Sequence, residues 1–156
     1  MGTKGYERED RLRSYLSLGT MASALRDKSF LQRFAVRSGR KEFVLESPTI
    51  YPSFDVNVIN LSLKPKRLSI EAYLDQFIRE NRIDPVMICA TATSAQLDEA
   101  RKVAGAARVI SSDALRVIGG PHVSVLPAEY LKDSEYQVAC IGEGVEILTE
   151  IALRLN

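Results

Sequence analysis

Two patterns that alternate from residue 55 onward predict that the chain folds as an α/β domain with a mostly parallel sheet. One is a series of short apolar runs, and the other is a series of segments whose apolar residues recur every three or four positions. Such runs suit strands that are buried on both faces, which places helices on each side of a parallel sheet. A chain of 156 residues can bury a core without a disulfide or a structural metal. We therefore expect one globular unit, with residues 1–54 as a helical segment and connecting loop and residues 55–156 as the α/β core.

The N-terminal third is predicted to be largely helical. Apolar residues keep helical spacing from Tyr15 to Val36, with a break around 27–29 and an end at Ser38 and Gly39. An apolar run at 43–45 then leads into a loop at 47–54. Residues 1–50 hold ten Lys and Arg against six Asp and Glu, a mild excess that is typical of a solvent-exposed face.

Four strands are expected in the core, each followed by a helix. The predicted strands are 56–61, 86–90, 115–118 and 137–141. Ser69 is a suitable N-cap for the first helix of the core, and Thr93 and Gln96 have the spacing of a capping box before the second. The second helix presents mostly small residues, which allows close packing on a sheet. A short helix is expected at 127–131 and the last helix at 145–155.

The loops after the last three strands carry the clearest functional signal. They are residues 90–96, 119–124 and 142–144, and they contain hydroxyl side chains or paired glycines. The ends of parallel strands lie along one edge of the sheet, where α/β proteins bind ligands. Glycines let a ligand approach the backbone, and hydroxyls and helix-start N–H groups can hydrogen-bond a phosphate or an amide. Taken singly, each glycine loop is more typical of an ordinary turn. The pair at neighbouring strands favours a ligand, such as a large polar cofactor.

Two polar side chains in these loops leave alternatives open. His122 could ligate a metal, donate to a ligand or cap a turn, and its loop position favours a hydrogen bond to a ligand. Glu143, between two glycines, could bond a ligand or stabilise the start of the last helix through the helix dipole.

Composition and motifs exclude several classes of protein. The net charge of +1 gives no basic excess for nucleic acid or an anionic membrane, and no apolar run is long enough to cross a membrane. The polar N-terminus lacks a signal-peptide centre, and the two cysteines are too few for a zinc or iron–sulfur site, so we expect a cytoplasmic protein with reduced thiols.

Ile147 stands where a dinucleotide fingerprint needs its third glycine, and no Walker loop occurs. We expect no catalytic residue in this chain.

The glycine loops and their strands resemble a known family, the cobalamin-binding domain that precedes the radical S-adenosylmethionine (SAM) domain of many bacterial and archaeal enzymes. The matching stretch runs from about residue 84 to 152 and contains ICATATSAQ, IGGPHVSVLPAEYL and IGEGVEIL in this order. A weaker match is LSLGTMASALRD at 16–27, which is similar to the first helix of the family.

The resemblance implies a flavodoxin-like or Rossmann-like three-layer sandwich that holds cobalamin at the carboxyl edge of its sheet. Carried over by position, the cofactor-binding residues are Thr91, Thr93 and Ser94 for the nucleotide tail or corrin amides, Gly119, Gly120, Pro121 and His122 on the next side, and Gly142, Glu143 and Gly144 on the third. The iron–sulfur cluster and SAM would belong to a radical SAM domain, in cis or in trans, that performs methyl transfer or related radical chemistry.

The sequence departs from the family pattern in three places. It lacks the Asp-x-His-x-x-Gly loop that gives cobalt a lower axial histidine, and His122 lies in a different loop, so water or another residue would take that position. The first strand of the family is not visible before Tyr15, and residues 43–45 are the candidate replacement. The Cys-x-x-x-Cys-x-x-Cys cluster motif is absent, so we expect the chain to be one part of a larger enzyme. The alternative is a degenerate domain without a cofactor that serves as a docking or oligomerisation module.

Overall fold

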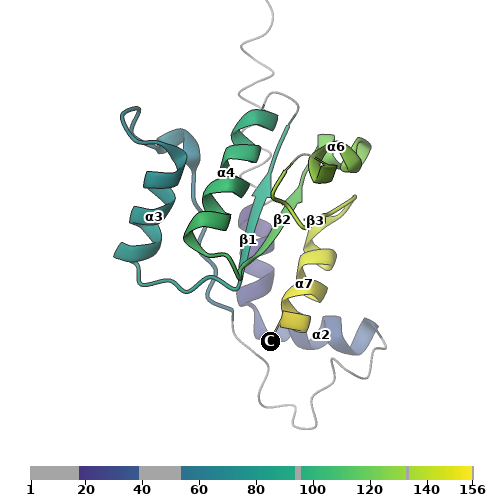
Figure 1. The fold of residues 1–156 in the computed structure, drawn as a ribbon. Helices are drawn as coiled ribbons and strands as arrows, with labels where there is room; N and C mark the ends of the chain where they lie inside the picture. Colours follow the sequence, from purple (N-terminus) through teal and green to yellow (C-terminus); the bar gives the residue numbers. More distant parts are fainter. Residues whose placement is uncertain (1–17, 39–53, 94–95, 133, 156) are drawn as a thin grey trace, which may run out of the picture.

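We describe a computed structural model of the chain, in which residues 18–38, 54–93, 96–132 and 134–155 are described (Figure 1). The strands of its sheet are β1 (Met87–Thr91), β2 (Leu115–Gly119) and β3 (Val138–Ala139). They lie in the order β1-β2-β3, and both pairings are parallel. The predicted α/β class with a parallel sheet is therefore confirmed. The apolar run predicted at 43–45 lies outside the described residues.

The N-terminal helical region is divided in two, as the sequence predicts. Residues 18–26 are helical, Asp27 interrupts the helix, and α2 (Lys28–Ser38) follows. The Asp27 carboxylate accepts hydrogen bonds from the backbone N–H groups of Ser29 at 2.9 Å and Phe30 at 3.2 Å. The break is thus an N-cap, because Asp27 satisfies donors that the first turn of α2 leaves without helical partners.

Helices cover both faces of the sheet (Figure 1). On one face, α3 (Ile70–Glu80) packs on α4 (Leu97–Ile110), with Leu74 and Val103 buried between them. On the other face, α7 (Gly144–Leu155) packs on the sheet through Leu148, and Met21 of the helix at 18–26 joins the same cluster. The Ser69 hydroxyl accepts the N–H of Ala72 at 3.0 Å, so the predicted N-cap of α3 is confirmed. None of the helices in the described part is long and apolar enough to cross a membrane.

The strand predicted at 56–61 is wrong. Residues 54–60 form no ladder, and η2 (Leu61–Leu63) is a short 3-10 helix. Some of their apolar side chains are nevertheless packed, with Phe54 and Val56 in the cluster of Leu25 and Ile59 in the cluster of Leu74. Val58 is 45% exposed, so the apolar pattern reports packing only in part, and it does not supply the neighbouring strand that a ladder needs.

The second half of the core differs from the prediction at two places. An unpredicted helix, α5 (Pro121–Val125), follows β2 directly and precedes the predicted short helix, α6 (Pro127–Lys132). The last strand is shorter than the predicted 137–141, because the side chain of Gln137 replaces a strand carbonyl and accepts the N–H of Arg116 at 3.0 Å. The pairing resumes beyond it, where the N–H of Cys140 donates to the carbonyl of Ile118 at 2.7 Å.

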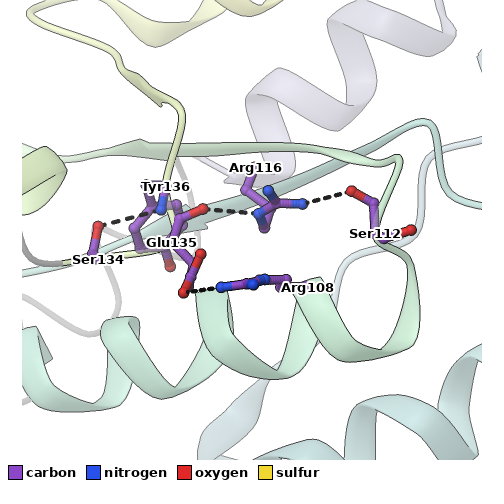
Figure 2. Close-up of polar contacts among 6 residues, drawn as sticks. All are labelled: Arg108, Ser112, Arg116, Ser134, Glu135 and Tyr136. Atoms are coloured by element: carbon purple, nitrogen blue, oxygen red, sulfur yellow. Dashed lines mark hydrogen bonds and ion pairs between the residues drawn. The ribbon is translucent and has the colours of Figure 1, made fainter.

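A buried arginine joins the start of β2 to the segment before β3 (Figure 2). Arg116 is only 7% exposed, and its guanidinium donates to the carbonyls of Glu135 at 2.8 Å, Ser112 at 3.1 Å and Ala114 at 3.0 Å. The Glu135 carboxylate is held separately by Arg108 of α4 at 2.6 Å. Because carbonyls have no net charge, this cation is stabilised by hydrogen bonds rather than by an ion pair.

We predict that Arg116→Met lowers the free energy of unfolding by about 3 kcal/mol, because it leaves the buried carbonyl of Ala114 and two half-buried carbonyls without this donor. Urea unfolding measures the loss. The matched control is Arg79→Met, which breaks an ion pair with Asp75 whose arginine is 77% exposed and should change stability by less than about 1 kcal/mol. Equal losses in the two variants would contradict the role assigned to Arg116.

Candidate functional site

The loops that follow the three strands lie together at the carboxyl edge of the sheet, the upper edge in Figure 1. This arrangement follows from the parallel pairing, which aligns Thr91 at the end of β1 with Gly119 at the end of β2. The short ladder between β2 and β3 brings the third loop, from Cys140 onward, to the same edge.

The first two loops are in direct backbone contact. The N–H of Ala92 donates to the carbonyl of Gly119 at 3.0 Å. Gly120 has a φ of 122°, and a Cβ atom built on it would lie 2.6 Å from the Ala92 carbonyl oxygen and 2.9 Å from the Thr91 hydroxyl oxygen. A glycine is thus required at 120 by the approach of the first loop as well as by the backbone conformation.

Ser124 joins the second loop to the third. Its hydroxyl donates to the carbonyl of Gly120 at 3.1 Å and accepts the N–H of Gly142 at 3.0 Å. Gly142 has a φ of 81°, and a built Cβ there meets no atom within 4 Å. The three loops therefore form one continuous surface with exposed backbone at Gly142.

The hydroxyl loop after β1 is partly occupied by its own contacts. The N–H and the hydroxyl of Thr93 both donate to the side-chain oxygen of Gln96, each at 3.2 Å. This is one of the two hydrogen bonds of the predicted capping box, the one in which the side chain of Gln96 accepts from the N–H of Thr93. The other bond, in which the Thr93 side chain would accept the N–H of residue 96, is absent, because Gln96 itself is the N-cap residue of α4. Thr91 is half-buried, and Ser94 lies outside the described residues.

His122 is paired with a buried tyrosine. Its Nδ1 lies 2.7 Å from the hydroxyl oxygen of Tyr130 in α6, and the two rings meet edge to face at 5.6 Å between centroids. Tyr130 is fully buried, and this burial raises the pKa of its hydroxyl, which stays protonated. With Nδ1 engaged, the second ring nitrogen of His122, Nε2, has no partner in the described part of the chain.

Of the remaining predicted site residues, some border the loop surface at the carboxyl edge of the sheet and one packs at the start of α7. Pro121 is exposed at the first position of α5, and Glu143 is exposed beside Gly142. Gly144 begins α7, and a Cβ built on it would lie 2.8 Å from the terminal methyl carbon of Met21. Gly144 therefore allows close contact with the helix at 18–26, whereas Pro121 and Glu143 border the loop surface.

A cavity of about 1030 Å³ opens beside the first loop. Thr91, Thr93 and Gln96 line one end of it, and its other lining residues include residues 54–59, the exposed side of β1 and apolar side chains of the surrounding helices. The loop surface is thus continuous with a mostly apolar space next to β1.

Two residues of the site are missed by reasoning from the sequence. Ser124 links two loops. It stands four residues after Gly120, and a helix that starts at Pro121 brings residues at this spacing into contact, so its position in the sequence could have indicated this role. Tyr130 fixes His122, and its place in the predicted helix at 127–131 gave no indication of that pairing.

The two cysteines are free and lie in one buried cluster on the α7 face of the sheet. Burial raises the pKa of the Cys89 thiol to about 12 and also raises that of Cys140. Both thiols stay protonated at neutral pH and lack the thiolate form that binds metals. No group of three His, Cys, Asp or Glu within the described ranges could hold a metal ion.

Comparison with protein families identifies the architecture. The family model described as B12 binding domain matches residues 48–152, which are 105 of the 156 residues. The chain belongs to the B12-binding domain family. Its fold is accordingly flavodoxin-like, and the family cofactor is cobalamin or a related corrinoid. No curated protein and no solved structure matches the chain.

The loop surface of this B12-binding domain suits a corrinoid in its chemistry. A corrinoid presents a flat ring that already ligates its cobalt, peripheral amides and a long nucleotide tail. Exposed backbone at Gly142, the ring nitrogen of His122 and the hydroxyls of Thr91 and Thr93 beside the cavity offer hydrogen-bonding groups for such amides. Large polar cofactors are held by such groups at strand ends, so the residues present fit the group.

The two left-handed glycines of the B12-binding domain should respond differently to alanine. Gly120→Ala is expected to lower the free energy of unfolding by about 3 kcal/mol, because φ is strained and the methyl group meets the Ala92 carbonyl. Gly142→Ala should lower it by about 1 kcal/mol, because only the strain applies. Urea unfolding compares them, and a larger loss at Gly142 would contradict the contact between the loops.

The raised pKa of Cys89 predicts a specific loss of stability in alkali. A neutral thiol is favoured in the folded chain, so its stabilising effect is complete below pH 9, the ordinary range of the thiol, and is lost as pH rises toward 12. The unfolding free energy of the wild type should therefore decline relative to that of Cys89→Ala over this range. Alkylation of Cys89 in the native chain should follow the same titration, and a midpoint near pH 9 would contradict it.

Proposed function

We propose that the chain holds a corrinoid across its three-loop surface, with the ring over the loops and the nucleotide tail directed to the first loop. The observation that carries this proposal is the linkage of the loops through Ala92, Gly119, Ser124 and Gly142, which makes one surface of three segments far apart in sequence. Family membership supplies the class of ligand.

The residues of the surface have distinct proposed roles. Thr91, Thr93 and Ser94 would bond the tail or corrin amides, while Gly119, Gly120 and Gly144 would act through shape, since contacts with Cys140, Ala92 and Met21 fill the space around them. Pro121, His122, Gly142 and Glu143 would line the remaining border. In this proposal the Nε2 atom of His122 is the polar group that its bond to Tyr130 orients toward the ligand.

When bound, the corrinoid would supply a methyl group or a redox centre, and the protein would supply binding and orientation. We place no histidine below the cobalt, because the sequence lacks an Asp-x-His-x-x-Gly loop and His122 is held in α5 by Tyr130. The chain contributes hydrogen bonds and shape rather than a metal ligand in this proposal.

We propose further that the bound corrinoid serves a radical SAM domain, in cis or in trans. Support comes from the combination of Gly119-Gly120-Pro121-His122 with Gly142-Glu143-Gly144, which resembles the cobalamin domains of those enzymes. The iron–sulfur cluster would belong to that partner, because two cysteines cannot provide its three-cysteine motif and both lie in the apolar cluster below the loops.

Reconstitution with hydroxocobalamin tests the binding proposal. After removal of the excess by gel filtration, the visible spectrum should report about one corrinoid per chain. His122→Phe keeps an aromatic ring but removes both nitrogens, and it should weaken binding about fivefold, the equivalent of one hydrogen bond. Tyr130→Phe is the matched control, because it removes the same internal bond and leaves Nε2 in place.

The outcomes separate the two functions that the sequence leaves open. A colourless protein would contradict corrinoid binding and favour the degenerate docking or oligomerisation module. Corrinoid retention with equal weakening in both variants would contradict the direct role proposed for His122, because the loss would then come from its bond to Tyr130.

A further inference from the structure

Within the part of the chain that the structure describes, strand β1 has a free edge. The carbonyl of Val86 accepts the N–H of Leu115 and the N–H of Ala92 donates to Gly119, so the even-numbered residues of this segment pair with β2. In a parallel ladder, the N–H and C=O groups of one residue both face the same neighbouring strand, and those of the next residue both face the opposite side. The N–H and C=O groups of Met87, Cys89 and Thr91 therefore point away from β2, and no donor or acceptor of the described ranges pairs with them.

The cavity of about 1030 Å³ lies along this free edge. Residues 54–59 form its far wall, and they pack into the layers on both sides, with Val56 on the Leu25 side and Ile59 on the Leu74 side. They form no ladder, and the carbonyl of Val56 accepts a hydrogen bond from the Arg26 guanidinium. The cavity thus lies between the outward groups of β1 and a segment that is not part of the sheet.

Both remaining walls of the cavity are mostly apolar, with Asn81 and Glu99 among the polar exceptions. Met21 and Ala152 line it from the layer of the helix at 18–26 and α7, and Phe77 and Val103 line it from the layer of α3 and α4. An extended segment between them would be buried on both faces, the environment of a strand inside a parallel sheet.

We propose that this cavity receives an extended, apolar segment of another polypeptide, which pairs with β1 as an added strand. The hydrogen-bonding groups favour a polypeptide over an apolar small molecule. Six backbone groups of β1 face the space, and burying them under a hydrocarbon would leave them unsatisfied. A peptide backbone supplies matching donors and acceptors at the same spacing, which is the basis of strand addition.

The proposed segment is short and uncharged. Since β1 has five residues, the paired length is about 17 Å. Apolar side chains would face both layers, unlike those of a strand with one side in solvent. The inference does not depend on corrinoid binding, because it concerns the edge of β1 and the apolar walls rather than the loop surface.

Hydrogen exchange measured by NMR tests the free edge directly. In the purified chain, the amides of Met87, Cys89 and Thr91 should exchange at least about tenfold faster than those of Ile88 and Ala90, which pair with β2. The probe is a peptide of about five alternating valines and isoleucines between lysine pairs. Its addition should slow exchange at Met87, Cys89 and Thr91 about tenfold.

Two controls isolate strand pairing from apolar contact. The same peptide with N-methyl groups on alternate amides keeps its side chains but loses donors, and it should give no protection. Ala22→Phe places a large ring on the wall of the cavity and should abolish binding, whereas Val109→Phe, at a 71% exposed position of α4, should leave it unchanged.

Four results would overturn the proposal. Slow exchange of all three amides in a monomeric chain without peptide would mean that the chain fills the edge itself. Slow exchange together with a dimer in sedimentation would assign the cavity to a second copy. Protection of Met87 and Cys89 by hydroxocobalamin alone would assign it to the cofactor. Equal protection by the N-methylated peptide would show that the cavity recognises apolar surface only.

Discussion

The close approach of the Ala92 carbonyl to Gly120 sets the geometry on which the loop surface depends. Only a residue without a side chain leaves room for this approach, and the bond from the Ala92 N–H to the Gly119 carbonyl holds the segment after β1 against the turn into α5. Because Gly120 turns the chain directly into a helix, Ser124 lies one turn above it and reaches the third loop. One backbone contact thus positions residues of three loops.

Helix α5 distributes polar groups to two sides of this surface. Ser124 faces Gly120 and Gly142, whereas His122 faces the buried hydroxyl of Tyr130 in α6. Each of these side chains bonds a part of the protein, and this reduces the number of conformations available before a ligand arrives. Such preorganisation lowers the conformational cost of binding.

The sequence predicts features that depend on local chemistry better than those that depend on distant pairing. Ser69 and Asp27 act on N–H groups within three residues, and the α3 cap and the break before α2 follow from the sequence. The strand at 56–61 was wrong because an apolar pattern reports burial and carries no information about a neighbouring strand. The glycine loops were correctly expected at one edge, but the bonds of Ser124 and Tyr130 required the position of α5.

The backbone groups of the sheet are satisfied differently on the two sides of β2. Between β2 and β3, side chains complete the ladder, since Gln137 bonds the N–H of Arg116 and the guanidinium of Arg116 reaches the Glu135 carbonyl. Proteins commonly protect an edge with charged or covering residues, because unpaired backbone invites another strand. Along β1, the facing groups of Met87, Cys89 and Thr91 meet an apolar cavity with no such side-chain partner in the described chain. Since side chains complete the ladder between β2 and β3, the lack of any such partner for the outward groups of β1 in the described residues supports the proposed addition of a strand there.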